Sequence, residues 1–584
     1  MTINFSTIKR LKILWQYFSV RRQRQFKLLL ILMVVASSTE VLSIGAILPF
    51  LGVLTNPNRI YESSVIKPLI EVLGINAAHD LVVPITVIFC TIAFISAAMR
   101  LLLLWASSKL TYVVGADLNI DIYRKTLYQS YVEHIKKNSS DVISNIGFRN
   151  QEIIVIINQV VVLLSSLLII FAVSVTLLLI EPVVTLCAFV GISSLYAIII
   201  RVTHKRLVSN SHKIAKNSSN AIRSLQEGLG GIRDILIHNT QELYCRIFFK
   251  ANLLLRTAQA DNIFIGGSPR YLVEALSMML IAALACGIAV KTEGISGAIP
   301  ILGALALGAQ RLLPLVQSSY LAWSTINGAQ ATLDDTLILL GQPLPKFVND
   351  PSAVNSIGFN ESISLRNVSF RYENRISYVL KDVNLEIKKG SRIGFVGDTG
   401  SGKSTLVDII MGLLPPNDGA FLVDGFDVNK ADPRSWQAHI AHVPQSIYLA
   451  DASIAENIAL GCALKDLDMN QVVNAAKLAQ IDDAICEMPN GYQTVVGEHG
   501  IRLSGGQRQR IGIARAMFKK ADVLIFDEAT SALDEATENM VTEAIRSLSS
   551  DLTILTIAHR EKSLRYCSEI YRIHDGTVTL EKKS

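Results

Sequence analysis

Cysteine is scarce in this sequence, and the few cysteines are not arranged for chemistry. The 584 residues contain seven cysteines, with no Cys-x-x-Cys pair and no Cys/His spacing of the kind that holds zinc. A disulfide framework and a zinc site are therefore not indicated, and we interpret the cysteines as small apolar side chains. The sequence also has no solenoid repeat and no low-complexity tract. Residues 1–25 are polar and basic, unlike a cleaved secretory signal peptide.

Charged residues are also few. Only 18% of the residues are charged, 50% are hydrophobic, and the mean hydropathy is +0.38. This composition is too apolar for an ordinary soluble enzyme and too charged for a chain that lies wholly in a membrane, so we predict an apolar half and a soluble half. The net charge of +6 is mild, and the basic residues cluster beside hydrophobic segments. That pattern indicates orientation in a membrane and argues against a nucleic-acid partner.

Six segments are long and apolar enough to cross a bilayer, which takes about 20 helical residues. They lie near Phe26–Leu54, Leu81–Leu104, Ile156–Ile180, Pro182–Ile200, Tyr271–Val290 and Gly297–Trp323. The long connections after the second and fourth segments carry the basic residues Arg124, Lys125, Lys136, Lys137, Lys205, Arg206, Lys213 and Lys216. The positive-inside rule therefore places the N-terminus, both connections and the C-terminal half in the cytoplasm. We predict a multi-pass protein of the inner (cytoplasmic) membrane.

Two amphipathic stretches flank the first span. "TIKRLKILWQYF" places apolar residues at helical intervals between cations, which predicts an interfacial helix within residues 1–25. "SSVIKPLIEVLGI" is interpreted as either a short outer helix or a packed extracellular loop. Beyond these stretches we predict a transmembrane domain over 26–325, a linker over 326–360 and a nucleotide-binding domain over 361–584. The fold class is thus an all-α domain of six membrane spans followed by a cytoplasmic α/β domain.

The soluble half contains a phosphate-binding loop. "RIGFVGDTGSGKSTLVDIIMGLL" reads as a strand, a glycine-rich loop and an amphipathic helix, the context in which G-x-x-x-x-G-K-S binds nucleotide phosphates. The glycines allow successive backbone N–H groups to point inward, and the helix N-terminus favours an anion. The predicted ATP-binding residues of this loop are Gly397, Asp398, Thr399, Gly400, Ser401, Gly402, Lys403, Ser404 and Thr405. Lys403 would reach the β- and γ-phosphates, and Ser404 would ligate Mg²⁺.

Two adjacent carboxylates complete the predicted hydrolytic site. "VLIFDEATSALD" contains a short buried strand that ends in Asp527 and Glu528. Asp527 at the strand tip would hold Mg²⁺, and Glu528 would polarise the attacking water as a general base. An acidic turn without a function is the alternative, but a phosphate loop needs such a partner and this is the candidate that the sequence offers.

"IRLSGGQRQRIGIARAM" resembles the signature motif of ABC ATPases through its Leu-Ser-Gly-Gly-Gln pentapeptide. The resemblance implies that Ser504, Gly505, Gly506 and Gln507 bind the γ-phosphate of an ATP molecule held by the opposite subunit. A helix N-terminus preceded by two glycines suits an anion. One signature and one phosphate loop per chain then imply a pair of chains, and the intact motifs favour a homodimer.

Further motifs of the same family follow in order. Tyr372 in "SFRY" resembles the aromatic residue that stacks on adenine, and Gln445 in "HVPQ" resembles the Q-loop glutamine that touches Mg²⁺. "TVVGEHG", with Glu498, looks like the loop that exporters place against the transmembrane domain. Asp534 ends a D-loop-like "SALD", and His559 in "TIAHR" resembles the switch histidine at the γ-phosphate, which together with Lys403 and Glu528 would be catalytic.

The membrane half extends this resemblance. Six spans with two long cytoplasmic connections ahead of one ATPase domain resemble a type I ABC exporter half-transporter. The segments "YVEHIKKNSSDVI" and "GGIRDILIHNTQELYCRIF" are similar to the coupling regions of such exporters, although either could be an ordinary cytoplasmic helix.

Charges within the spans are the clue to the substrate. They are Glu40, Arg100, Arg270, Glu274 and Arg311. Such residues are functional candidates by default, yet they could also pair with one another or reach the membrane surface. "TEVLSIGAILPF", the arginine of the second span, "SPRYLVE" and "RLLP" together resemble bacterial lipid-linked oligosaccharide flippases. The resemblance implies that the arginines handle an anionic pyrophosphate headgroup, which suits their planar, permanently charged guanidinium.

Three readings of function stay open at this point. The first is an ATP-driven flippase for a lipid-linked oligosaccharide or a similar amphipathic anionic glycolipid. The second is an exporter of peptide, lipid or drug, in which the arginines are structural. The third, a soluble ABC ATPase with a mechanical or repair role, is disfavoured by the six spans.

Overall fold

The computed structural model describes residues 7–55, 57–61, 77–180, 182–291, 299–345, 357–373, 376–430, 432–528, 536, 538–540, 543, 551–558, 564–565 and 567–583. The chain divides into two compact units. The first unit contains Met1–Gln129 and Lys136–Leu344, and the second contains Ser130–Ile135 and Pro345–Ser584.

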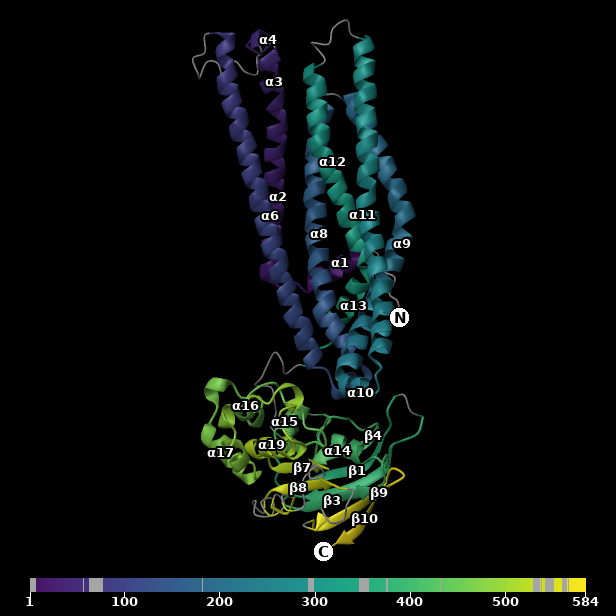
Figure 1. Ribbon diagram of the computed structural model, residues 1–584, viewed down its shortest axis with the longest axis vertical. Coiled ribbons are helices and arrows are strands. Elements are labelled where there is room, and N and C mark those ends of the chain that lie inside the picture. The colour runs from purple at the N-terminus through teal and green to yellow at the C-terminus, as the bar shows by residue number, and fades with distance from the viewer. Residues whose placement is uncertain are drawn as a thin grey trace. The chain divides into compact units, whose positions relative to one another are not determined.

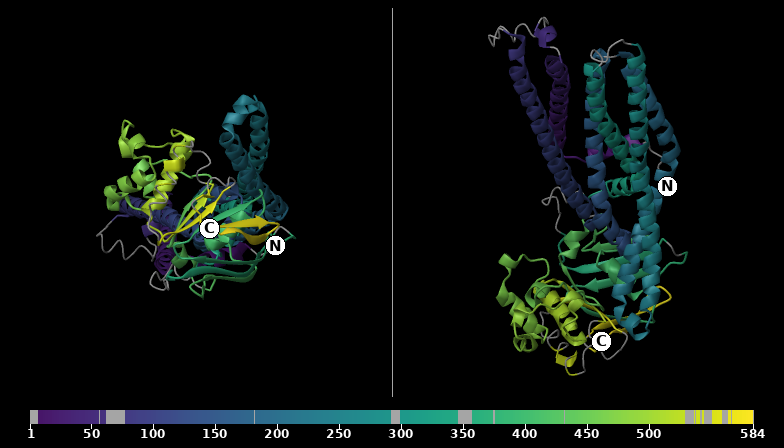
Figure 2. Two further views of the ribbon diagram at one scale, coloured as in Figure 1. Left: turned by 90° about the horizontal axis from the view of Figure 1, so that it is seen from below. Right: turned by 45° about the horizontal axis from the view of Figure 1, so that its top comes forward.

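The first unit is helical (Figure 1). Its helices are α1 (Thr7–Gln16), α2 (Val20–Gly45), α3 (Ile47–Thr55), α4 (Pro57–Tyr61), the 3₁₀ helix η1 (Ala78–Leu81), α6 (Val82–Leu127), α8 (Ser139–Ile180), α9 (Pro182–Gly230), α10 (Ile232–Ile237), α11 (Gln241–Lys291), α12 (Ile299–Gly328) and α13 (Gln330–Leu340). Helix α7 (Tyr131–Lys136), between α6 and α8 in the chain, belongs to the second unit up to Ile135. Helices α2 and α6 run side by side, and α8, α9, α11 and α12 pack into a second group, as both views in Figures 1 and 2 show.

The long helices of this unit carry a lipid-compatible surface. Among the described residues, three helical stretches are long and apolar enough to cross a membrane, namely Val20–Leu54, Ala78–Leu127 and Gln151–Leu179. Large apolar side chains point outward from them: Phe94 is 76% exposed and Leu179 is 83% exposed. Such exposure would be costly in water and is favourable in hydrocarbon. The other three predicted spans lie on α9, α11 and α12.

The helices continue well beyond the membrane. Helix α9 has 49 residues and α11 has 51, which corresponds to a length of about 75 Å, whereas a hydrocarbon core is about 30 Å thick. The two long cytoplasmic connections predicted from the sequence are therefore mostly continuations of the spanning helices. Each predicted coupling segment contains one short helix, α7 or α10. The proposed outer amphipathic stretch lies outside the described residues.

The second unit is an α/β domain with two sheets. Its strands are β1 (Ser362–Phe370), β2 (Leu380–Lys388), β3 (Arg392–Gly397), β4 (Asp418–Val423), β5 (Phe426–Asp427), β6 (Ile440–Val443), β7 (Val523–Asp527), β8 (Thr553–Ile557), β9 (Glu569–His574) and β10 (Thr577–Lys583). One sheet has the order β2-β1-β4-β5 and is antiparallel; the other has the order β10-β9-β3-β8-β7-β6, with parallel neighbours from β9 to β6. Because β3 and β7 are nearly continuous apolar runs, they are buried on both faces.

The other helices of this unit are α14 (Lys403–Ile410), α15 (Pro433–Gln437), α16 (Ile454–Ile458), α17 (Met469–Leu478), α18 (Asp482–Cys486) and α19 (Gly505–Phe518), with the 3₁₀ helices η5 (Leu464–Asp466), η6 (Gly491–Gln493) and η7 (Glu498–Gly500). Helices α14 and α19 contact strands of the second sheet, whereas α16 and α17 pack on α19 and α18 packs on α17. Residues 130–135 belong to this unit, and Val132 packs against its hydrophobic core. The predicted fold class, a helical transmembrane domain followed by an α/β ATPase domain, is confirmed.

The stretch between the two units begins differently from the prediction. Residues 326–360 were predicted to be a linker on the basis of the Pro-, Asn- and Ser-rich stretch 341–358, yet α12 continues to Gly328 and α13 follows over Gln330–Leu340. The helix breaks at Ala329, which has φ −120° and ψ 18°. Helix α13 exists because it buries Leu333 and Leu340 in the core of the first unit.

Candidate ATP and transport sites

The phosphate loop joins β3 to α14 as the sequence predicts. Gly402 has φ +107°, and a Cβ there would lie 3.1 Å from the carbonyl oxygen of Val379. At Gly397 (φ +156°), a Cβ would lie 2.3 Å from the carbonyl oxygen of Ile573. Only glycine satisfies both positions, because any side chain would meet rigid backbone. The loop is thereby folded tightly between β9 and the start of β2.

Polar groups of the loop are arranged for an anion. The buried ammonium of Lys403 donates to the carbonyl oxygens of Gly397 (2.7 Å) and Asp398 (2.9 Å). The Ser401 hydroxyl oxygen is buried and has no hydrogen-bond partner among the described residues. A buried hydroxyl without a partner costs free energy unless a ligand satisfies it. The loop therefore fits a phosphate group, which would accept hydrogen bonds from the donors gathered here.

The structure brings the Q-loop glutamine and the predicted general base together. Gln445 Nε2 donates to Glu528 Oε2 at 2.7 Å, although the two residues are 83 positions apart in the sequence. The Glu528 backbone N–H donates to the Ile557 carbonyl oxygen at 3.1 Å, and Glu528 has φ +50°. A positive φ is unusual for a residue with a side chain and is common at functional sites. The turn directs the chain away from β7 directly after Asp527.

Asp408 on α14 lies close enough to Asp527, at the end of β7, for the two carboxylates to repel each other. Burial and, to a smaller extent, the negative charge of Asp527 together raise the pKa of the Asp408 carboxyl to about 6. Sequence analysis did not single out Asp408.

Tyr372 lies beside the phosphate loop, and its role in stacking on adenine stays a prediction. Its hydroxyl is 3.2 Å from Thr405 Oγ1, and its ring meets Phe370 edge-on with centroids 5.0 Å apart.

The signature residues form the N-terminus of α19. Ser504 Oγ accepts from the Gln507 N–H at 3.2 Å, and Gln507 Oε1 accepts from the Ser504 N–H at 2.9 Å. This reciprocal cap fixes the helix start.

Three predicted ATPase elements can be described only in part. The "TVVGEHG" loop includes η7, and its His499 ring meets Tyr448 edge-on at 5.9 Å. Asp534 and His559 lie outside the described residues, so their placement stays a prediction.

In the membrane unit, two of the five charged candidates form an ion pair beside a cavity. Arg100 Nε lies 3.6 Å from Glu40 Oε2, and the Ser96 hydroxyl donates to the same oxygen at 2.7 Å. The Glu40 side chain is 5% exposed and that of Arg100 is 42% exposed. The cavity has a volume of about 470 Å³ and is lined by Glu40, Ser43, Ile47, Phe50, Leu51, Phe89, Ala93, Arg100, Ile169, Gln310, Pro314 and Leu315.

Arg270 and Glu274 are not among the described residues that line this cavity. Arg270 is exposed on α11, Glu274 is half-buried, and no ion pair connects them among the described residues. Arg311 lies on α12, but its side chain is outside the described set. Ser96 and Gln310 were missed by sequence analysis. Ser96 precedes Arg100 by four residues, so helical spacing could have placed both on one face.

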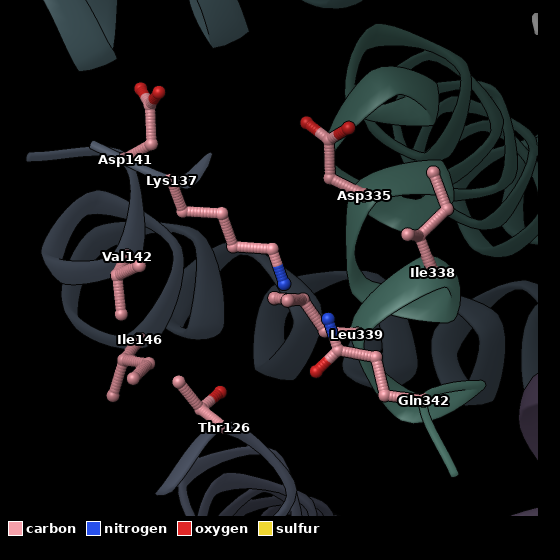
Figure 3. A pocket seen from close by; sticks show the side chains of 9 residues that line it. All are labelled: Thr126, Lys137, Asp141, Val142, Ile146, Asp335, Ile338, Leu339 and Gln342. Carbon is pink, nitrogen blue, oxygen red and sulfur yellow. The ribbon is translucent and has the colours of Figure 1, made fainter. Parts of the chain in front are cut away.

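A smaller cavity of about 190 Å³ lies between the end of α6, the start of α8 and α13 (Figure 3). The Lys137 side chain extends into it toward Leu339 and Gln342, whereas Asp141 and Asp335 lie at its edge. The Gln342 Oε1 atom is buried and lacks a hydrogen-bond partner among the described residues. None of the sequence-predicted site residues lines it.

Comparison with known proteins defines the class. The family model "ABC transporter transmembrane region" matches residues 44–294, and the model "ABC transporter" matches residues 380–531. The chain is an ABC exporter in which a membrane-spanning helical region precedes a cytoplasmic, ATP-hydrolysing ABC domain. The predicted enzyme class and membrane location are thereby confirmed.

Individual relatives place the chain more closely. It is 28% identical over 583 residues to the heterocyst differentiation ATP-binding protein HepA of Nostoc sp., covering 96% of this chain and 91% of that protein. It is 42% identical over 235 residues to the leukotoxin export ATP-binding protein LtxB of Aggregatibacter actinomycetemcomitans, but this match covers only 40% of this chain and 33% of the relative. A solved bacterial Atm1-family ABC exporter with ATP bound superposes with a TM-score of 0.79 at 21% identity, over 95% of this chain and 94% of that one. This likeness shows a shared fold.

Proposed function

We propose that two copies of this chain form an ATP-driven flippase that moves a lipid-linked oligosaccharide, or a similar anionic glycolipid, across the cytoplasmic membrane. The observation that carries the proposal is the cavity at Arg100, because it combines a fixed cation with apolar walls. A lipid-linked substrate has the same two parts, namely a charged phosphate group and a hydrocarbon chain.

The contacts of Arg100 suit a phosphate group. Its Nε faces Glu40, and Glu40 is itself held by the Ser96 hydroxyl. The terminal nitrogens of the guanidinium remain available to bind two phosphate oxygens in parallel. The stacked rings of Phe50 and Phe89, with centroids 4.8 Å apart, line the same cavity and offer an apolar surface for a lipid chain.

ATP supplies the energy in this proposal. We assign phosphate binding to Gly397–Thr405 with Lys403, adenine stacking to Tyr372, and activation of the attacking water to Glu528. Mg²⁺ would be held by Ser404, Asp527 and Gln445, where it would neutralise phosphate charge. The contact between Gln445 and Glu528 supports their placement in one site. Ser504 to Gln507 of one copy would bind the nucleotide of the other, with Asp534 and His559 in their predicted roles.

The test is transport by the full chain in liposomes. ATP-dependent flipping of a fluorescent polyisoprenyl-pyrophosphate sugar is measured for wild type, Arg100→Ala, Arg100→Lys, and the control Lys109→Ala on the same helix. A bidentate charge-assisted contact is worth about 1.5–3 kcal/mol, so Arg100→Ala should weaken apparent substrate affinity roughly ten- to hundredfold. Arg100→Lys should recover part of that loss. Unchanged flipping by Arg100→Ala, with Glu528→Gln inactive, would show that Arg100 does not bind the headgroup.

Arg270 and Arg311 belong to the same test, because the family resemblance implies a headgroup role for both. Arg270→Ala and Arg311→Ala are measured beside Arg100→Ala. If only Arg100→Ala loses substrate affinity, the headgroup site is confined to the cavity.

Export of a peptide, another lipid or a drug on the same scaffold is the second candidate. The names of relatives favour it: besides the leukotoxin exporter, the chain is 38% identical over 228 residues to a putative multidrug export protein, YgaD of Bacillus subtilis. Stimulation of ATPase activity distinguishes the two. A lipid pyrophosphate should stimulate hydrolysis in the flippase, whereas stimulation by hydrophobic cations or peptides alone supports the second candidate.

A further inference from the structure

The N-terminal end of the chain carries charge of one sign. The first acidic residue in the sequence is Glu40, and seven basic residues precede it. Two of the seven are neutralised by distant carboxylates: Arg10 pairs with Asp334, and Arg22 pairs with Asp117 at 2.7 Å. Lys12, Arg21, Arg24 and Lys27 are exposed. A strongly basic surface thus remains on α1 and on the first two turns of α2.

Apolar side chains lie among these cations. Ile8 is 80% exposed, Val20 is 65% exposed and Leu28 is 64% exposed, and Trp15 is also exposed. On α1, Ile8, Lys12 and Trp15 follow helical spacing and share one face. Exposed tryptophan and isoleucine beside lysine are typical of a helix that lies at the level of lipid headgroups. The surface continues directly into the membrane-crossing stretch Val20–Leu54.

The opposite face of α1 is firmly held by α13. Arg10 Nε and Nη2 donate to the two carboxylate oxygens of Asp334 at 2.6 and 2.9 Å, and the Arg10 residue is 6% exposed. Gln330 Nε2 donates to Thr7 Oγ1 at 2.8 Å. A buried bidentate pair fixes orientation as well as distance. Any shift of α1 therefore shifts α13.

Helix α13 is also held at its other end, next to the connection toward the ATPase domain. Lys125 Nζ donates to the Leu340 carbonyl oxygen, and Gln129 Nε2 donates to the Pro343 carbonyl oxygen at 3.3 Å. Both donors lie at the end of α6 or directly after it, where the chain turns into α7. Helix α13 thus connects α1 to the α6–α7 turn.

We propose that the basic surface, defined as Lys12, Arg21, Arg24 and Lys27, binds anionic phospholipid headgroups of the cytoplasmic leaflet, and that the Arg10–Asp334 pair transmits this binding to α13 and raises ATPase activity. The charge of the surface selects anionic over zwitterionic lipid. Its apolar side chains select a lipid bilayer over a soluble phosphate.

The test uses the full chain in nanodiscs of phosphatidylcholine alone or of an equimolar mixture with phosphatidylglycerol. Bound phosphatidylglycerol is counted by native mass spectrometry, and ATP hydrolysis is measured in both. Each basic residue contributes about a fivefold factor in affinity, so Lys12→Gln/Arg24→Gln/Lys27→Gln should weaken phosphatidylglycerol binding on the order of a hundredfold and lose the stimulation. The control Lys465→Gln/Lys477→Gln/Lys520→Gln removes the same charge from exposed sites of the ATPase domain and should behave as wild type.

A second set of variants separates binding from transmission. Arg10→Gln and Asp334→Asn should bind phosphatidylglycerol as wild type does but lose the stimulation, and the exchange Arg10→Asp/Asp334→Arg should restore part of it. Equal stimulation in the surface variant and in wild type would overturn the lipid site. Full stimulation in Arg10→Gln would overturn the transmission. Stimulation by soluble glycerol phosphate to the same level would show that the ligand is a free anion and would also overturn the proposal.

Discussion

Replacing Asp408 by asparagine should stabilise the ATPase domain, and more so at higher pH. The carboxyl group has a pKa of about 6 in the folded protein, against 3.8 for an ordinary aspartate, because it is buried and lies near the charge of Asp527. A raised carboxyl pKa means that the folded state penalises the charged form. Above the folded pKa the protein carries this cost in full, and the cost declines as the pH falls through 6 and disappears below about 4.

The size of the effect follows from the shift. About two pKa units correspond to roughly 3 kcal/mol, and partial exposure of the side chain reduces this to about 2 kcal/mol. Asparagine has nearly the same shape and cannot ionise, so Asp408→Asn should gain about that amount near pH 8 and little near pH 4. For a domain of this size, 2 kcal/mol corresponds to a rise in Tm of about 4–8 °C.

Scanning calorimetry of the full chain without nucleotide measures this gain. The ATPase transition is the one that moves when ATP is added. Asp424→Asn is the matched control, for which the opposite change in stability is expected. Burial alone would raise the pKa of Asp424, but hydrogen bonds from the backbone N–H groups of Asn360, Ser362 and Glu361 outweigh burial and lower this pKa. That variant should therefore lose stability near neutral pH. The reasoning would be refuted if the Tm of Asp408→Asn equalled that of wild type, or if it exceeded the wild-type Tm by the same amount near pH 5 and near pH 8.

Other substitutions test the ATP site. Glu528→Gln should bind ATP and hold the paired ATPase domains closed, so rapid hydrolysis by this variant would contradict its role as general base; single-turnover assays measure this. Lys403→Ala should lose ATP binding, measured by fluorescent nucleotide titration, because no other ammonium sits at the loop carbonyls in the described residues. Gly397→Ala should place a methyl group 2.3 Å from the Ile573 carbonyl oxygen and cost about 1–3 kcal/mol, and a Tm equal to wild type would show that the loop relaxes freely.

The ATP site could be predicted largely from sequence because its parts are local patterns. The glycine positions, Lys403 and the strand that ends at Asp527 each follow from a few consecutive residues. The contact between Gln445 and Glu528 could be expected only through the family resemblance, since 83 positions separate them. Asp408 could not be identified from the sequence because its raised pKa arises mainly from burial, which no short motif encodes.

The membrane charges show the opposite case. Their spacing in sequence left both pairing and function open, and the structure shows that pairing differs from one residue to another. Glu40 and Arg100 pair across two helices, whereas no ion pair joins Arg270 to Glu274 in the part of the chain that is described. Helix α13 was missed because the predicted linker was extended from the Pro-, Asn- and Ser-rich stretch 341–358 back to residue 326, while the stability of α13 comes from tertiary burial of Leu333 and Leu340.

The pair between Arg10 and Asp334 also sets an order of events during biosynthesis. Its two members are 324 positions apart, and the ribosome makes α1 first and α13 after the whole membrane region. At a translation rate of about 5–20 residues per second, roughly half a minute passes between the synthesis of Arg10 and that of Asp334. During that time the guanidinium must be hydrated or held by lipid headgroups, since burying it alone would be costly. Helix α1, which is synthesised long before α13, is thus among the last helices to reach its final contacts, and its docking requires a completed membrane half.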